Sequence, residues 1–202
     1  IYFADGILGT AASTADVTIT GGAGDDYVGT QIATGDFNYD NKTDLLVSAS
    51  AYSGGGNKGR AYIFYNDGTM PTTAGTADVT ITGTTDGDFF GGALAVGDFN
   101  SDNRTDFAIG AIGVSSSAGS VYIFHNDGSI PTTAGTADVT ITGTTAGDDF
   151  GKSLAAGDFN SDSRVDLAVG GPDANSLTGR IYIFHNDGSV PTTAATADVT
   201  IS

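Results

Sequence analysis

The stretch GDFNSDNRTD at residues 97–106 recurs twice more in this chain, as GDFNYDNKTD at residues 35–44 and as GDFNSDSRVD at residues 157–166. Counted from the first aspartate of each copy, oxygen-bearing side chains fall at positions 1, 3, 5 and 9. A tight loop with this alternation turns its oxygens inward, and calcium takes six to eight oxygen ligands in such loops. The stretch therefore predicts three copies of one turn, each a candidate site for a hard cation.

We predict that each of these acidic loops binds calcium through the four side chains and, by analogy with other acidic loops, through the backbone carbonyl at position 7. The predicted ligands are Asp36, Asn38, Asp40, Lys42 and Asp44 in the first loop, Asp98, Asn100, Asp102, Arg104 and Asp106 in the second, and Asp158, Asn160, Asp162, Arg164 and Asp166 in the third. Position 6 holds Asn41, Asn103 and Ser163, and Ser tolerates a left-handed backbone less well than Asn, so the third site is expected to be the weakest. The alternative is that the aspartates only form turns and hold no ion.

Two familiar metal sites fit these loops poorly. An EF-hand needs a bidentate Glu at position 12, and this chain has Val47, Ile109 and Val169 there. Zinc prefers Cys or His ligands, and neither residue occurs in the loops. Calcium is therefore the predicted ion.

The composition agrees with cation binding. The 202 residues carry a formal net charge of -17, and all 24 acidic residues are Asp. Such a charge disfavours nucleic acid and anionic membrane surfaces as partners. The chain has no Cys and no apolar run near the ~20 residues that span a membrane, so disulfides and membrane insertion are not expected.

The acidic loops belong to a longer repeat, because their first aspartates lie 62 and then 60 residues apart. Each repeat contains four short segments with the pattern of strands, here named A to D. In the middle repeat they are residues 94–96 before the loop, 106–110 after it, 121–124, and the β-branched run 138–142. No stretch has helical periodicity over ten residues, so the fold class is predicted to be all-β.

Repeats of four strands without helices are typical of β-propeller blades. Residues 1–22 match the C and D part of a repeat and predict a half blade, followed by whole blades at residues 23–82, 83–142 and 143–202. We therefore predict about three and a half four-stranded antiparallel blades, all part of one propeller. Because a ring needs ~4 to 8 blades, the chain is expected to be part of a longer protein, and an extended or self-assembled array is the alternative.

The repeats also resemble a known family. Phe90-Gly91 and Phe150-Gly151 precede a short strand, the acidic loop, an apolar strand and, in the last repeat, Gly170-Gly171-Pro172. This order resembles the FG-GAP repeat of integrin α-subunit propellers and their microbial relatives. The first repeat departs from it with Val28-Gly29, and residues 48–50 and 110–112 replace Gly-Ala-Pro. The resemblance implies a propeller of roughly seven blades, calcium in the A–B loops, and partners bound mainly on the opposite face by the D–A and B–C loops.

Residues present in every repeat are more typical of architecture than of catalysis. We expect the loop phenylalanines to wedge between blades and the strand C tyrosines to be core residues: Phe37, Phe99 and Phe159, and Tyr62, Tyr122 and Tyr182. His125 and His185 lack a matching nucleophile or third ligand. Glycosidase-like acid pairs are conceivable at residues 25–26 and 148–149, but turn formation is the preferred interpretation, as it is for Asp86 and Asp88.

Function is expected where the repeats differ, in the small polar B–C loops at residues 52–58, 114–117 and 173–177. We predict a calcium-stabilised, non-enzymatic adhesion or structural module that binds a protein or carbohydrate surface. A lectin-like propeller and an accessory domain of a larger secreted hydrolase are the alternatives; Tyr52 is the only aromatic residue in the B–C loops, which ranks the lectin second. Weak calcium binding favours an extracellular location. Sequons at residues 41–43 and 103–105 would place glycans on the ion loops, which favours a prokaryotic source.

Overall fold

Each of the three full repeats folds into a four-stranded antiparallel sheet with its strands in chain order, which confirms the all-β prediction. The computed structural model describes residues 1, 11–22, 26–51, 56–188 and 190–202. We name the sheets blade 1, blade 2 and blade 3. Blade 1 contains β1 (Ile32–Gly35), β2 (Asp44–Ala49), β3 (Arg60–Phe64) and β4 (Val79–Thr82); blade 2 contains β5 (Phe90–Gly97), β6 (Asp106–Ala111), β7 (Ser120–Phe124) and β8 (Val139–Thr142); blade 3 contains β9 (Ser153–Gly157), β10 (Asp166–Gly171), β11 (Arg180–Phe184) and β12 (Val199–Ile201).

The predicted strands lie where the alternating and β-branched runs placed them, within a few residues. The largest difference is β5, which begins at Phe90 rather than at Leu94. A register shift between Phe90 and Ala93 marks a bulge that lets the strand continue past its glycines. In blade 2 the Phe-Gly pair is therefore part of the first strand, whereas in blade 3 Phe150-Gly151 precede β9.

Helical structure in the described residues is limited to segments of three or four residues. Four 3-10 turns occur, three of them between the last two strands of a blade: η1 (Ala12–Thr14), η2 (Ala74–Thr76), η3 (Ala134–Thr136) and η4 (Ala194–Thr196). The B–C connections contain α1 (Val114–Ser117) and α2 (Ala174–Leu177), whose central residues have left-handed backbone angles. These segments are turns, in keeping with the absence of helical periodicity.

The half blade predicted for residues 1–22 is only partly visible. Its expected strand C falls largely on residues outside the described part of the chain. The expected strand D is not a strand among the described residues, which contain η1 and a single bridge from Thr20 to Thr73. A lone bridge forms because Thr20 still meets the edge of the following blade.

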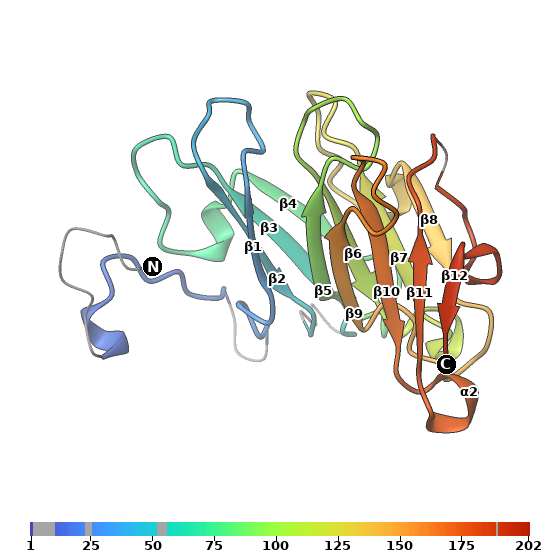
Figure 1. Cartoon of the computed structure of the whole chain (residues 1–202). Helices are drawn as coiled ribbons and strands as arrows, with labels where there is room; N and C mark the ends of the chain where they lie inside the picture. The colour runs from blue at the N-terminus through green and yellow to red at the C-terminus, as the bar shows by residue number, and fades with distance from the viewer. Residues whose placement is uncertain (2–10, 23–25, 52–55, 189) are drawn as a thin grey trace.

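The three blades stand face to face in a row, from blade 1 to blade 3 (Figure 1). Their first strands, β1, β5 and β9, lie side by side, as the inner strands of neighbouring propeller blades do. Backbone bridges repeat at each junction: Gly59 pairs with Phe90 and Gly119 with Phe150, both in parallel. Neighbouring blades are thus joined by main-chain contacts as well as by side chains.

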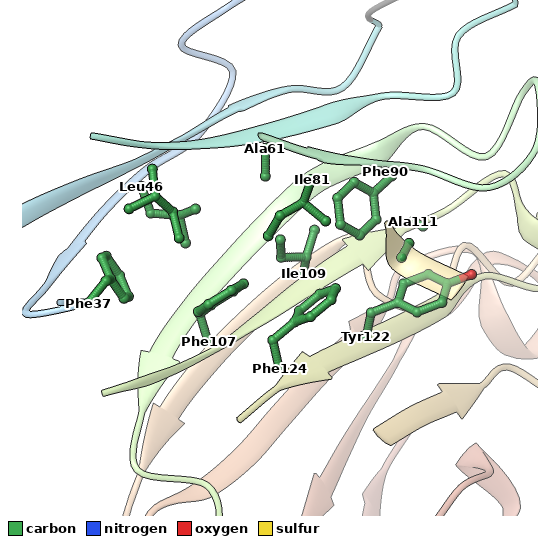
Figure 2. Close-up of a cluster of buried hydrophobic side chains, with 12 residues drawn as sticks. Phe37, Leu46, Ala61, Ile81, Phe90, Phe107, Ile109, Ala111, Tyr122 and Phe124 are labelled. Carbon is green, nitrogen blue, oxygen red and sulfur yellow. The ribbon is translucent and has the colours of Figure 1, made fainter. Parts of the chain in front are cut away.

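Apolar side chains fill the space between blades. Between blades 1 and 2 the cluster takes Phe37, Leu46, Ala61 and Ile81 from one side (Figure 2). The other side supplies residues of blade 2, among them Phe90, Phe107, Ile109, Ala111, Tyr122 and Phe124. The rings of Phe37 and Phe107 meet edge to face with their centroids 5.7 Å apart, a favoured aromatic geometry. An equivalent cluster joins blades 2 and 3.

The prediction that all three loop phenylalanines are wedges is correct for two of them. Phe37 and Phe99 are 1% and 2% exposed, whereas Phe159 is 45% exposed. The reason is positional, since Phe37 and Phe99 pack against the following blade and, among the described residues, no blade follows blade 3. Ile181 and Ile201 are exposed on the same face for the same reason.

No helix in the described part of the chain combines the length and the apolar character needed to cross a membrane.

Candidate functional site

The acidic loops connect the first and second strands of each blade and share one backbone shape. Positions 4 and 6 are left-handed in every copy, with φ between 61° and 69° at Tyr39 and Asn41, Ser101 and Asn103, and Ser161 and Ser163. Asn tolerates this region best among non-glycine residues. Ser163 adopts the same conformation as Asn41 and Asn103, so the predicted weakness of the third loop has no counterpart in its backbone.

Side chains at positions 1, 3 and 5 turn toward the loop backbone. In the second loop, Asp98 Oδ1 and Asn100 Oδ1 both accept the amide of Asp102, each at 3.0 Å. Asp98 Oδ2 accepts from Asn103 at 2.8 Å, and Asp102 Oδ1 accepts from Arg104 at 2.8 Å. The first and third loops repeat these bonds. Two oxygen ligands therefore converge on one amide in every copy.

The aspartate at position 9 has a different environment from the other three predicted ligands. Asp106 is fully buried; its Oδ2 accepts the amide of Phe99 at 2.9 Å and its Oδ1 accepts the amide of Asn126 at 2.8 Å. Asp44 and Asp166 make the equivalent pairs of bonds. This carboxylate ties the acidic loop to the corner that follows strand C.

Electrostatics separate the buried carboxylate from the exposed ones. Burial raises the pKa of Asp106 above its usual value, although the amides of Asn126 and Phe99 oppose the shift. The pKa of Asp158 is lowered, chiefly by the backbone N–H of Ser163. The pKa of Asp40 is lowered mainly by its hydrogen bond from Lys42. The exposed loop carboxylates with a resolved shift are therefore held in the charged form that a cation requires.

The donor set suits a hard cation, but the side chains face backbone amides. Among the residues the structure describes, no three acidic or histidine side chains gather closely enough to hold a metal as they stand. Each carboxylate has about four lone-pair positions, so one that accepts two amides retains capacity for an ion. Ion binding at positions 1, 3 and 5 would require these side chains to share or exchange their amide bonds, and the oxygen-only chemistry fits calcium rather than zinc.

All three loops have a cation at position 7, but in the first loop that cation pairs with a predicted ligand. Lys42 Nζ lies 3.1 Å from Asp40 Oδ2, on a predicted ligand. In the second and third loops the same oxygen accepts from the neighbouring amide, Asn100 or Asn160, also at 3.1 Å. A cation in the first loop would compete with an ammonium group for this carboxylate.

The B–C loops, predicted to carry recognition, also join the blades. The carbonyl of Ser117 accepts the amide of Asp149 at 3.0 Å, and that of Ala118 accepts the amide of Phe150 at 3.3 Å. Residues 56–58 form the same kind of link to the D–A loop of blade 2, whereas residues 52–55, including Tyr52, lie outside the described residues. Main-chain carbonyls of these loops therefore hold neighbouring blades together. The side chain of Leu177, by contrast, is 77% exposed on the B–C loop of blade 3.

The other candidates have structural surroundings. Asp88 is buried and accepts both the hydroxyl of Thr84 and the amide of Thr85 at 2.8 Å, which supports its interpretation as a turn acid. Asp26 and Asp148 are buried too, Asp149 bonds Lys152 at 2.7 Å, and Asp25 lies outside the described residues. The three strand C tyrosines, Tyr62, Tyr122 and Tyr182, are buried as expected.

Sequence reasoning missed the asparagine that follows strand C. Asn66, Asn126 and Asn186 each donate a backbone N–H to the position 9 aspartate of their own blade. The side chain of Asn126 also donates to the carbonyl of Phe37 in blade 1 at 2.9 Å. The asparagine recurs in an Asn-Asp-Gly sequence in all three repeats, which could have indicated a shared role. However, Asn-Asp-Gly also forms turns for purely local reasons.

Comparison with known proteins agrees with this geometry. The family described as FG-GAP repeat matches residues 28–64, 90–124 and 150–184, just over half of the chain. Each match begins in or just before the first strand of a blade and ends at the last residue of the third. The matched segments therefore contain the acidic loops.

Similar proteins include integrin α chains and a phospholipase. The chain is 33% identical to integrin alpha-PS5 of Drosophila melanogaster over 163 residues, which cover 78% of the chain and 15% of that protein. It is 34% identical to phosphatidylinositol-glycan-specific phospholipase D of Bos taurus over 160 residues, 73% of the chain and 19% of the enzyme. Integrin alpha-E of Mus musculus is 32% identical over 162 residues, 73% of the chain and 14% of that protein. The chain thus spans less than a fifth of each, and these animal relatives lend no support to a prokaryotic source.

Proposed function

Because the chain belongs to the FG-GAP repeat family, we propose that it is a calcium-stabilised, non-enzymatic β-propeller module that acts outside the cell in adhesion or as a structural part. One observation carries the proposal. Three loops of different sequence place the same oxygen donors in the same hydrogen-bonded arrangement. Each copy also has Asp at three of its nine positions, although Asn or Ser would serve a turn that needed no ion.

The residues that would hold the ion are the side chains at positions 1, 3 and 5, with the position 7 carbonyl and the position 9 aspartate. In the second loop these are Asp98, Asn100, Asp102, Arg104 and Asp106. A bound ion would supply positive charge among carboxylates that otherwise repel one another. The left-handed backbone at positions 4 and 6 sets the shape of the loop that presents these donors. Two buried backbone amides, those of Phe99 and Asn126, hold the carboxylate at position 9.

Thermal unfolding tests the calcium proposal directly. A ligand that binds only the folded chain raises its stability by an amount that grows with ligand concentration. We expect the Tm to rise with millimolar calcium, to fall in chelator, and to respond little to magnesium, which prefers a more rigid octahedral site. An unchanged Tm between calcium and chelator would reject the proposal.

A loop variant controls for general effects of the ion. Asp98→Asn together with Asp102→Asn removes two charges from the second loop while keeping side chains of similar shape. Isothermal titration calorimetry should then detect one fewer calcium site. An unaltered number of sites would show that calcium binds elsewhere on this acidic surface.

The adhesion role is supported by the nature of the relatives and by the surface. Integrin α chains share the repeat, and the B–C loops of blades 2 and 3 expose Ser115, Ser116 and Leu177 on a rigid base. Loops held in this way commonly bind partners. Calcium-dependent retention of the chain on immobilised extracellular matrix proteins is the expected result, and its loss in a triple Ser115→Arg, Ser116→Arg, Leu177→Asp variant would place the contact on these loops.

The phospholipase D relatives support a second candidate, an accessory domain of a secreted hydrolase. In that case the chain alone should neither hydrolyse a phosphodiester nor bind matrix proteins. It should instead raise the activity of the hydrolase to which it is fused. Comparing the fused and the isolated enzyme separates this role from adhesion.

A further inference from the structure

The two described junctions between blades have the same backbone plan but different side chains on the face of the acidic loops. At position 4 of the loop, the first junction has Tyr39 and the second has Ser101. After strand C, the first has Tyr65 and the second has His125. Two phenol rings at one junction are thus replaced by a hydroxymethyl group and an imidazole at the other.

At the first junction the Tyr39 ring is held by a cation. The guanidinium carbon of Arg104, from the loop of blade 2, lies 4.9 Å from the centre of the Tyr39 ring. Burial raises the pKa of Tyr39 despite the opposing effect of Arg104, so the phenol stays neutral. An aromatic ring beneath an arginine is a favourable contact.

At the second junction the corresponding place is hollow. Ser101, His125 and Arg164 line a surface hollow of about 370 Å³ between blades 2 and 3, with Phe99 and Val139 among its apolar walls. Arg164 occupies the loop position of Arg104, and its Nη1 donates to the carbonyl of Asn186 at 3.1 Å. The Arg164 guanidinium is thus held in place, but position 4 of the second loop, Ser101, offers it no aromatic ring.

One side chain that lines this hollow, His125, has a polar atom without a partner in the part of the chain that the structure describes. Nε2 of His125 is buried and has no hydrogen-bond partner among the described residues. A buried polar nitrogen without a partner is costly, and a hydroxyl can act as donor or acceptor to either tautomer. The hollow therefore combines an apolar wall and a cation with an imidazole, and a turn of that ring would bring its buried Nε2 to a ligand.

We propose that this hollow binds the phenol ring of a tyrosine presented by a partner protein. The chain itself supplies the template, because Tyr39 places such a ring at the equivalent point of the first junction. The ring of the partner would lie against Arg164, and its hydroxyl would pair with Nε2 of His125 once the imidazole turns toward the hollow. The net charge of -17 further selects a partner segment that is neutral or basic around the tyrosine.

Titration of the full chain with N-acetyl-tyrosinamide, followed by NMR of the backbone amides, tests the proposal. We expect saturable shifts at Ser101, His125 and Asn186, and affinity about fivefold weaker for N-acetyl-phenylalaninamide, the size of one net hydrogen bond. Capped Lys-Tyr-Lys should bind more tightly than capped Glu-Tyr-Glu. Free p-cresol that bound while both peptides and the capped tyrosine did not would overturn a protein partner in favour of a small phenol.

Two reciprocal variants provide the controls. Ser101→Tyr copies the residue of the first junction onto a backbone of the same conformation, with φ of 62° against 63°, and should abolish binding while the chain stays folded. Tyr39→Ser should open a second site with shifts near Arg104 and Asn126. Absence of saturable binding to the unmodified chain, or binding that survives in Ser101→Tyr, would overturn the proposal, and equal affinity for the two capped residues would overturn the role of His125.

Discussion

The side-chain amide of Asn126 donates a hydrogen bond of 2.9 Å to the carbonyl of Phe37, across the boundary between blade 2 and blade 1. The backbone N–H of the same residue bonds Asp106 in its own acidic loop. Asn126 is 1% exposed, so neither bond is shared with solvent. One residue thus connects two neighbouring acidic loops.

Replacing Asn126 with Ala leaves the buried carbonyl of Phe37 without its donor. We expect a loss of about 1–3 kcal/mol in the free energy of unfolding, measured by urea denaturation with an unchanged m-value. Asn186→Ala is the matched control, because its side chain makes a longer bond of 3.4 Å to Ser101 Oγ, a group that water can reach. Equal losses in both variants would contradict the importance of the link to Phe37.

Asp106→Asn tests whether position 9 supports the fold independently of any ion. An amide offers one acceptor oxygen where the carboxylate offers two, so one of the two backbone N–H donors, of Phe99 or Asn126, loses its partner. The expected cost in chelator is about 1–3 kcal/mol. Asp98→Asn should cost less there, since Asp98 is partly exposed and water can replace the lost bond. An unchanged stability of Asp106→Asn in chelator would indicate that position 9 matters only through the ion.

Gly119 lies at a close approach between blade 2 and blade 3. A Cβ atom built on Gly119 would lie 2.0 Å from the carbonyl oxygen of Phe150, and the residue has φ of +82°. Gly119→Ala should therefore cost more than about 2 kcal/mol, combining backbone strain with displacement of blade 3. Gly179, with φ of +80°, has the same conformation in blade 3, but its nearest atom is the carbonyl oxygen of Pro172 at 3.3 Å. Gly179→Ala should show the strain alone, and equal Tm values for the two variants would refute the argument.

Lys42 should weaken calcium binding in the first loop, if the proposed function is correct. Its ammonium group lies 3.1 Å from Asp40 Oδ2 and competes with an ion for that oxygen. Lys42→Ala is expected to tighten the first site a few-fold in calorimetric titrations at low salt, and the difference should shrink at high salt because the pair is exposed. Arg104→Ala is the control, since Asp102 Oδ2 bonds the Asn100 amide instead. Tightening in the control alone would contradict the competition.

The sequence predicted the architecture well because the repeat presents each signal three times. The strand pattern, the acidic loops and the burial of Phe37 and Phe99 follow from alternation and turn chemistry, which are local. The exposure of Phe159 did not follow, because it depends on what lies beside blade 3 rather than on any neighbouring residue. The role of the B–C loops in joining blades was missed for a related reason, because it depends on backbone carbonyls, which every residue has. Side-chain patterns predict which face of a strand is buried and where turns occur. Contacts between blades depend instead on where a blade stands in the row of three.

The parallel bridges that join Thr82 to Thr133 and Thr142 to Thr193 have an evolutionary consequence. They use backbone atoms at equivalent positions, so a duplicated copy of the 60-residue unit finds its neighbour already complementary. Such an array can lengthen by tandem gene duplication without a new interface having to arise. Selection can then change the side chains of one junction without changing the others. The two described junctions already differ in this way, with Tyr39 at position 4 of one loop and Ser101 at position 4 of the next.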